Sequence, residues 1–242
     1  MNPIVLIPAR MGARRLPGKP LADIGGAPMI AHVARAAVAA GIGPVVVAAA
    51  DPEILAPASA AGARAVLTDP ALPSGSDRVF AALEAVDPQG AHDVIVNLQG
   101  DMPFIDPAAI RACLAALAAG GCDIATLAAP EASAADRDNP DVVKAILALD
   151  PGGKIGRALY FTRSRLYGEA PIWRHVGLYA FRRAALHRFT AAAPAELERR
   201  ENLEQLRALE LGLSIRAAII AAAPLSVDSP ADLEAVRRQE RA

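Results

Sequence analysis

The sequence contains little of several residue types that would define a function class. Only two cysteines occur among 242 residues, Cys113 and Cys122, with no CxxC pair and no neighbouring histidine. This argues against a zinc site, a redox pair or a disulfide framework, and favours buried thiols. Basic residues are not in excess, because 25 Lys and Arg stand against 26 Asp and Glu and the formal net charge is -1. This balance argues against a protein that binds nucleic acid.

Long apolar runs are also missing, although hydrophobic residues make up 53% of the chain. The excess is mostly alanine, and no stretch of about 18 or more strongly apolar residues predicts a membrane span. The N-terminal MNPIVLIPAR is typical of a strand and lacks the cationic start and the cleavage site of a signal peptide. We therefore expect a cytoplasmic protein with no membrane partner.

Short β-branched runs alternate with longer Ala, Leu and Arg segments in the first half of the chain. This alternation predicts an α/β fold with a Rossmann-like, mostly parallel sheet flanked by helices. The predicted strands are 4–9, 45–49, 65–67 and 94–98. The predicted helices are 28–40, 51–61, 76–86 and one that begins near 106. Asp51 is the expected N-cap of the second of these helices.

The regular alternation ends after Gly120. Four strands with few helices between them are predicted at 124–128, 142–149, 158–162 and 176–181. They indicate an antiparallel insertion over roughly 121–183. A helix at 198–211, a strand at 215–220 and a helix at 231–238 follow. Without Pro/Ser-rich linkers, residues 1–242 are expected to form one domain.

The loop after the first strand carries positive charge only. It contains Arg10, Arg14, Arg15 and Lys19, and no acidic residue precedes Asp23. Doubly wound folds bind ligands at the carboxyl ends of their strands, and Arg and Lys side chains can hold several phosphate oxygens, so we expect an anion here. A solvated basic loop is the alternative. Neither GxxxxGK[ST] nor GxGxxG occurs, so ATPase and hydride-transfer functions lose their usual support.

Two aspartates are candidates for a metal site. Asp101 follows the predicted strand 94–98, where a carboxylate can bind a hard cation or can simply end the strand. Asp228 precedes Ser229-Pro230 and could instead cap the last helix, a role for which Ser229 is equally suited.

Seven motifs follow one another along nearly the whole chain. They are PAR-x5-LPGKPL with DIGG-x-PMI, SGSDR at 74–78, VNLQGD at 96–101, NPDVVK at 139–144, RHVGLY at 174–179, LEQLR at 203–207 and VDSPADL at 227–233. In this order and spacing, the sequence closely resembles the 3-deoxy-manno-octulosonate (Kdo) cytidylyltransferases, a family of sugar nucleotidyltransferases.

The resemblance implies transfer of a cytidylyl group from CTP to Kdo, giving CMP-Kdo and pyrophosphate for lipopolysaccharide biosynthesis. It implies Mg²⁺ held by Asp101 and Asp228, and a homodimer formed through the inserted region. The implied catalytic residues are Arg10, Lys19, Asp101 and Asp228. The implied nucleotide contacts are Pro8, Ala9, Arg10, Arg15, Lys19, Arg78 and Gln99. The implied sugar-acid contacts are Gln99, His175, Tyr179, Glu204 and Gln205.

Alternatives remain at several of these positions. Arg78 could be an exposed arginine at a helix start, and His175 and Tyr179 could be packed core residues. The sequence departs from the family at three positions. Ala13 stands where serine is usual, Ala27 where lysine is frequent, and Met102 where many members have glutamate. A cytidylyltransferase for a related acid, such as 8-amino-Kdo or a sialic-acid-like sugar, is one alternative function. A nucleotide-binding homologue without catalysis is another.

Overall fold

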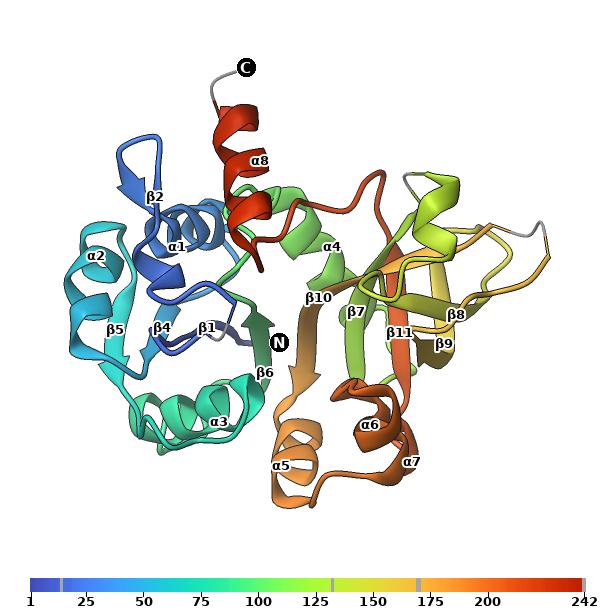
Figure 1. Ribbon diagram of the computed structural model, residues 1–242. Coiled ribbons are helices and arrows are strands. Elements are labelled where there is room, and N and C mark those ends of the chain that lie inside the picture. The colour runs from blue at the N-terminus through green and yellow to red at the C-terminus, as the bar shows by residue number, and fades with distance from the viewer. Residues whose placement is uncertain (14, 132, 169–170, 241–242) are drawn as a thin grey trace. The chain divides into compact units, whose positions relative to one another are not determined.

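The computed structural model describes residues 1–13, 15–131, 133–168 and 171–240. Arg14 of the cationic loop lies outside the described residues. The chain forms two compact units, one of Met1–Arg111 with Pro224–Ala242 and one of Ala112–Ala223 (Figure 1). The predicted insertion at roughly 121–183 falls inside the second unit, which extends further at both ends. That residues 1–242 form one domain stays a prediction.

The first unit contains a parallel sheet of four strands. They are β1 (Pro3–Ala9), β4 (Val45–Ala49), β5 (Arg64–Leu67) and β6 (Val94–Leu98), in the order β5-β4-β1-β6. In register, Val5 of β1 pairs with Val45 of β4 on one side and Val96 of β6 on the other. Every residue of β4 and β6 is buried, as the continuous apolar runs predict for a sheet covered on both faces. The predicted fold class is confirmed.

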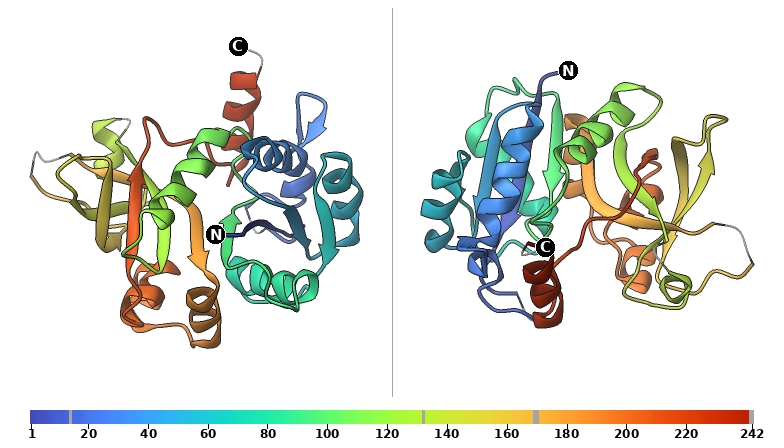
Figure 2. Two further views of the ribbon diagram at one scale, coloured as in Figure 1. Left: turned by 180° about the vertical axis from the view of Figure 1, so that it is seen from behind. Right: turned by 90° about the horizontal axis from the view of Figure 1, so that it is seen from above.

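Helices α1 (Met29–Ala40), α2 (Leu55–Ala60) and α3 (Gly75–Val86) connect these strands. α1 packs beside α2 on one face of the sheet, and α3 covers the other face, as right-handed crossovers require (Figure 2). The predicted helix 51–61 begins as a 3-10 turn, Pro52–Ile54, before α2. Asp51 precedes this turn, but its side chain does not cap it. Asp51 therefore occupies the N-cap position, as predicted, but its carboxylate accepts a hydrogen bond from Met11 N instead of from the turn.

The C-terminal segment returns to the first unit. The short strands β2 (Asp23–Ile24) and β3 (Ala27–Pro28) form a hairpin, and α8 (Pro230–Glu240) contacts β2 (Figure 1). The buried cluster that joins them consists of Ile24, Met29, Val227, Leu233 and Val236. Burial of these side chains holds residues 227–236 against the segment that follows the cationic loop.

The second unit contains a mixed sheet of five strands. They are β7 (Ile124–Pro130), β8 (Lys144–Leu149), β9 (Ile155–Thr162), β10 (Trp173–Arg182) and β11 (Ile215–Ile219). Their order is β10-β7-β11-β9-β8, and β8 also pairs with β10, so the sheet curls back on itself. Only β7 and β11 are parallel among these pairs. The four strands predicted after Gly120 all form.

The helices of this part are α5 (Arg183–Ala191), α6 (Glu196–Glu201) and α7 (Gln205–Glu210), and α4 (Pro107–Ala118) leads into it. The predicted single helix 198–211 is wrong. Asn202 adopts a left-handed conformation with φ 54°, which ends α6 and lets α7 begin in a new direction.

Cys113 and Cys122 are buried and form no disulfide with each other. Burial raises the pKa of both thiols. Among the described residues, no helix is both long enough and apolar enough to cross a membrane.

Candidate active site

The carboxyl ends of β1 and β6 form the centre of the candidate site. β1 pairs with β6 only as far as Leu6 and Asn97, whereas its pairing with β4 continues to Ala9. The chain order reverses here, since β4 and β5 lie on one side of β1 and β6 on the other. Ligands of open α/β sheets bind at such a switch point. The predicted contacts Pro8, Ala9 and Gln99 all lie there.

Glycines let three segments approach one another at this edge. A Cβ atom at Gly100 would lie 3.0 Å from the Pro8 carbonyl oxygen. One at Gly75, in the first turn of α3, would lie 3.5 Å from both Gln99 Oε1 and Pro8 Cγ. Gln99 Nε2 donates to Asn97 Oδ1 at 2.9 Å, which fixes its amide. Pro8 and Gln99 therefore form a defined wall beside the N-terminus of α3.

The cationic loop is anchored at both of its ends. Met11 N donates to Asp51 Oδ2 at 2.7 Å, and Gly18 N donates back to Met11 O at 3.0 Å. Gly18 has φ 72°, a conformation that glycine adopts without strain. The 3-10 turn Lys19–Leu21 begins directly after it. The closed loop thus sets where the Lys19 side chain starts.

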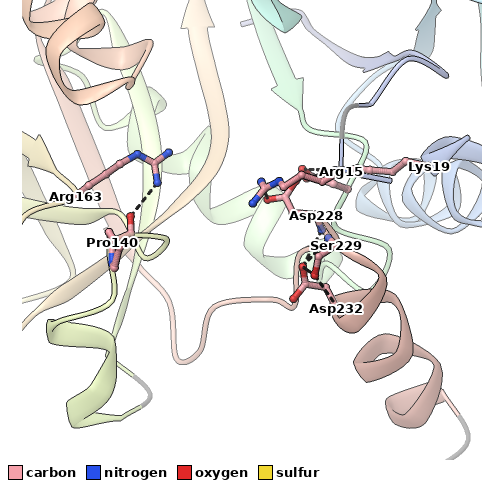
Figure 3. A network of polar contacts seen from close by, with 8 residues as sticks. Arg15, Lys19, Pro140, Arg163, Asp228, Ser229 and Asp232 are labelled. Atoms are coloured by element: carbon pink, nitrogen blue, oxygen red, sulfur yellow. Dashed lines mark hydrogen bonds and ion pairs between the residues drawn. The ribbon is translucent and has the colours of Figure 1, made fainter. Parts of the chain in front are cut away.

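Lys19 forms ion pairs with both candidate metal ligands, and Figure 3 shows its side chain together with those of Arg15 and Asp228. Its Nζ lies 3.2 Å from Asp101 Oδ2 and 3.1 Å from Asp228 Oδ1. Arg15 Nη2 lies 3.2 Å from the other oxygen of Asp228. Four residues that the sequence predicts for catalysis or phosphate binding therefore form one charged cluster, although Asp101 and Asp228 are far apart in sequence.

Two contacts explain how Asp228 reaches this cluster. Val227 N donates to the Asp101 carbonyl at 2.8 Å, which ties the backbones of the two segments together. The buried cluster around Ile24 and Val227 also holds the segment that carries Asp228 in place. The family resemblance implied that the two aspartates meet, but the contacts that bring them together could not be predicted, because they depend on tertiary packing.

Helix capping at α8 is performed by Ser229 and not by Asp228. Asp232 N donates to Ser229 Oγ at 3.3 Å, and Asp232 Oδ2 accepts from Ser229 N at 2.8 Å (Figure 3). This reciprocal pair is a capping box. The Asp228 carboxylate is thereby left to face Lys19 and Arg15.

The carboxylates fit a hard divalent cation. Burial raises the pKa of the Asp101 carboxyl, Lys19 opposes this shift, and Asp228 adds to it. Both carboxylates converge on one cationic atom and offer only oxygen, the donor that Mg²⁺ prefers. The described residues hold no group of three or more His, Cys, Asp or Glu that could bind a metal. Substrate oxygens and water would have to complete the coordination.

Arg78 is buried, with 2% of its surface exposed, so the alternative of an exposed helix-start arginine is wrong. Its Nη1 donates to Thr68 Oγ1 at 2.6 Å and to the Asp69 carbonyl at 3.0 Å. Burial, and then the charge of Arg10, lower the pKa of Arg78. The guanidinium thus fixes the loop after β5, and its contact with a nucleotide stays a prediction.

His175 and Tyr179 lie on one face of β10, as predicted. A bulge between Val176 and Tyr179 adds two residues relative to β7, which preserves the shared face. The two rings have centroids 5.5 Å apart. His175 Nε2 lies 3.0 Å from Thr126 Oγ1, and burial lowers the pKa of His175 to about 3. The imidazole is therefore neutral at physiological pH.

Glu204 lies near this pair, because its charge, after burial, raises the pKa of Tyr179. Gln205 follows at the start of α7 and is buried. The structure thus brings three of the predicted sugar-acid contacts together in the second unit, with Gln205 next to Glu204 in the chain. Gln99, which is also predicted to contact the sugar acid, belongs to the first unit.

A second polar network in this unit includes residues that sequence reasoning did not assign. Glu201 Oε2 accepts from Thr162 Oγ1 at 3.0 Å and from Arg163 N at 3.1 Å. Arg163 Nη1 donates to the Pro140 carbonyl at 3.0 Å (Figure 3). Lys144 is fully buried, and its Nζ donates to the Asn139 and Arg163 carbonyls at 2.6 and 3.1 Å. Lys144 ends the NPDVVK motif, whereas Glu201 lies among charged helix residues and belongs to none of the sequence motifs.

Comparison with known proteins agrees with this geometry. The family model for cytidylyltransferases matches residues 4–215. A 3-deoxy-manno-octulosonate cytidylyltransferase from Rhodospirillum centenum is 60% identical over 98% of this chain and 92% of its own length. One from Parvibaculum lavamentivorans is 56% identical with the same coverage. A solved structure of CMP:2-keto-3-deoxy-manno-octonic acid synthetase complexed with CTP is 37% identical, with a TM-score of 0.90 over 100% of this chain and 99% of that one. The chain belongs to the 3-deoxy-manno-octulosonate cytidylyltransferase family.

Proposed function

We propose that this enzyme transfers the cytidylyl group of CTP to Kdo, producing CMP-Kdo and pyrophosphate for lipopolysaccharide biosynthesis. The observation that carries the proposal is the cluster of Lys19, Asp101 and Asp228 at the switch point of the sheet. This cluster can hold a triphosphate together with a divalent cation. The same site makes a nucleotide-binding homologue without catalysis the weaker candidate.

In the proposed reaction, the anomeric hydroxyl oxygen of Kdo attacks the α-phosphorus of CTP. The new O–P bond forms in line with the bond to the β-phosphate, which breaks as pyrophosphate leaves, and the hydroxyl proton passes to solvent. No covalent enzyme intermediate is needed, because positioning and charge neutralisation can carry phosphoryl-type transfer. Arg10, Arg15 and Lys19 hold the triphosphate and neutralise the charge that develops on pyrophosphate.

Asp101 and Asp228 would hold Mg²⁺ in this reaction. The ion, when bound, neutralises phosphate charge and orients phosphate oxygens. Pro8 and Ala9 would bind the cytosine through their backbone, beside the amide of Gln99.

His175, Tyr179, Glu204 and Gln205 would hydrogen-bond the sugar acid. The low pKa of His175 means that its ring offers a hydrogen bond and no positive charge. A neutral imidazole suits the hydroxyl groups of a sugar, so the acid's carboxylate must be bound elsewhere.

We also propose a homodimer that works in the cytoplasm, where CTP is available. The support for a dimer is that Leu149 of β8 and Leu159 of β9 are exposed on the second unit. Light scattering on the purified protein tests this assembly, and a mass of about 50 kDa, twice 25.0 kDa, is expected.

The activity is tested by incubating the protein with Mg²⁺, each of the four ribonucleoside triphosphates and a panel of sugar acids, and following pyrophosphate. Release with CTP and Kdo is expected. Release only with 8-amino-Kdo or a sialic acid would establish the related-acid alternative. No release with any pair would leave the non-catalytic homologue.

A further inference from the structure

Lys19 occupies the position between the two carboxylates that a metal ion would need. Its Nζ lies 3.2 and 3.1 Å from one oxygen of each. The Lys19 side chain is 16% exposed and that of Asp101 25%, whereas Arg15, which forms an ion pair with Asp228, is 62% exposed. Among the residues that the structure describes, Lys19 is the cation whose ion pairs reach both acids.

An ammonium and a divalent cation compete for the same oxygens. Two neighbouring carboxylates repel each other and are stable together only with positive charge between them. Mg²⁺ would contact these oxygens at about 2.0–2.1 Å, which places it within repulsive distance of an ammonium that still donates to them. Lys19 must give up these ion pairs when a metal binds, and the phosphate oxygens of a nucleotide can accept its hydrogen bonds instead.

We propose that Lys19 couples metal binding to nucleotide binding. Without nucleotide it acts as a substitute cation that holds Asp101 and Asp228 together and weakens their affinity for a divalent ion. A triphosphate draws the ammonium onto its own oxygens and releases both carboxylates from Lys19. Metal thus enters with the nucleotide and not before it. This inference rests on the proposed function, since it requires the carboxylates to be metal ligands.

The test measures Mn²⁺ binding without nucleotide, by the paramagnetic resonance signal of the free ion. Lys19→Met is expected to bind Mn²⁺ about tenfold more tightly than the unmodified protein, a change of about 1.4 kcal/mol. Lys19→Arg keeps the charge and should bind as weakly as the unmodified protein. Lys154→Met, at an exposed lysine of the second unit, is the matched control and should change nothing.

A second measurement follows CTP binding by calorimetry in excess chelator. Lys19→Met should bind CTP several-fold more weakly, because the phosphates lose this partner. Tighter Mn²⁺ binding together with weaker CTP binding supports the coupling, and an unchanged melting temperature shows that the variant is folded.

Mn²⁺ affinity that Lys19→Met leaves unchanged or lowers would overturn the inference. If Lys19→Met gives this result but Asp101→Asn abolishes Mn²⁺ binding, the proposed metal site stands and only the coupling fails. If Asp101→Asn binds Mn²⁺ as well as the unmodified protein, both the metal assignment and the inference fail. Pyrophosphate release from CTP and Kdo judges the proposed function separately.

Discussion

At the residue scale, Asp228 and Ser229 show how neighbouring polar side chains divide two tasks. Either could cap the last helix on sequence grounds. Ser229 forms the capping box with Asp232, and Asp228 turns to Lys19 and Arg15. Stability and chemistry are therefore carried by adjacent residues that can be changed one at a time.

Asp228→Asn should consequently lower activity and Ser229→Ala should lower stability. The first removes a proposed metal ligand and should lower kcat on the order of a hundredfold or more while leaving the melting temperature nearly unchanged. The second loses a helix cap, about 1 kcal/mol or about 2–4 °C in melting temperature for a chain of this size, with activity retained. Steady-state kinetics and thermal unfolding of both variants check this, and equal kinetic losses in the two would contradict the division.

The neutral ring of His175 gives a prediction about pH. Its folded pKa of about 3 lies below the ordinary value of 6.5, so between these values the unfolded chain binds the proton and the folded chain does not. The free energy of unfolding should therefore fall as pH drops from 6.5 toward 4.

Urea unfolding at several pH values checks this prediction against His175→Gln, in which this part of the pH dependence should be missing. The His175 Cε1 proton should also show no titration between pH 8 and 5 in NMR spectra. A titration midpoint near 6.5 would show that the ring is exposed to solvent and would contradict its proposed setting.

At the element scale, regular strands and helices could be predicted, and their junctions could not. β4 and β6 match their predicted ranges because a buried parallel strand is a continuous apolar run bounded by turns. The helix 198–211 fails because one left-handed residue, Asn202, divides a segment whose composition is helical throughout. Asp51 occupies the predicted N-cap position, but its side chain makes no capping hydrogen bond, because its carboxylate accepts from Met11 N, which is distant in sequence.

Contacts between residues distant in sequence also separate the predicted part of the site from the part that was not predicted. Motifs identified Lys19, Asp101 and Asp228, and the resemblance assigned the two aspartates to one metal ion, but the ion pairs of Lys19 with both depend on packing of the C-terminal segment. Glu201 was missed because its role exists only through contacts with the end of β9.

The anchor of the cationic loop can be tested through Asp51. Asp51→Ala removes the acceptor for Met11 N and should raise KM for CTP about fivefold, the effect of losing about 1 kcal/mol. Asp51→Asn keeps an oxygen acceptor and should change KM less. Steady-state kinetics with varied CTP measure this, and equal KM values in all three proteins would show that the loop does not need this contact.

The Glu201 network should affect the sugar acid and not the nucleotide. Glu201→Ala removes the acceptor for Thr162 and for the backbone N–H of Arg163, so KM for Kdo should rise about tenfold, while KM for CTP, which we propose is bound by the first unit, stays unchanged. Glu201→Gln keeps part of the acceptor set and should restore much of the loss. The matched control is Glu196→Ala at an exposed position of the same helix. Equal increases in both KM values would point to general destabilisation.

At the scale of the whole molecule, the near-zero net charge conceals a separation of charge. The cations of the first loop precede every acid in the chain, and the fold places two of them, Arg15 and Lys19, beside carboxylates from distant segments. A surface without basic excess does not suit a nucleic-acid strand, while this local arrangement suits one triphosphate with its metal ion.

In the proposed reaction, the anomeric hydroxyl of Kdo attacks the α-phosphorus of CTP on this protein. Kdo labelled with ¹⁸O at that hydroxyl, incubated with CTP, Mg²⁺ and the enzyme, tests it directly by mass spectrometry of the products. We predict CMP-Kdo with the label between sugar and phosphorus, and unlabelled pyrophosphate in equal amount. Labelled pyrophosphate, an unlabelled bridge or no CMP-Kdo at all would contradict the account.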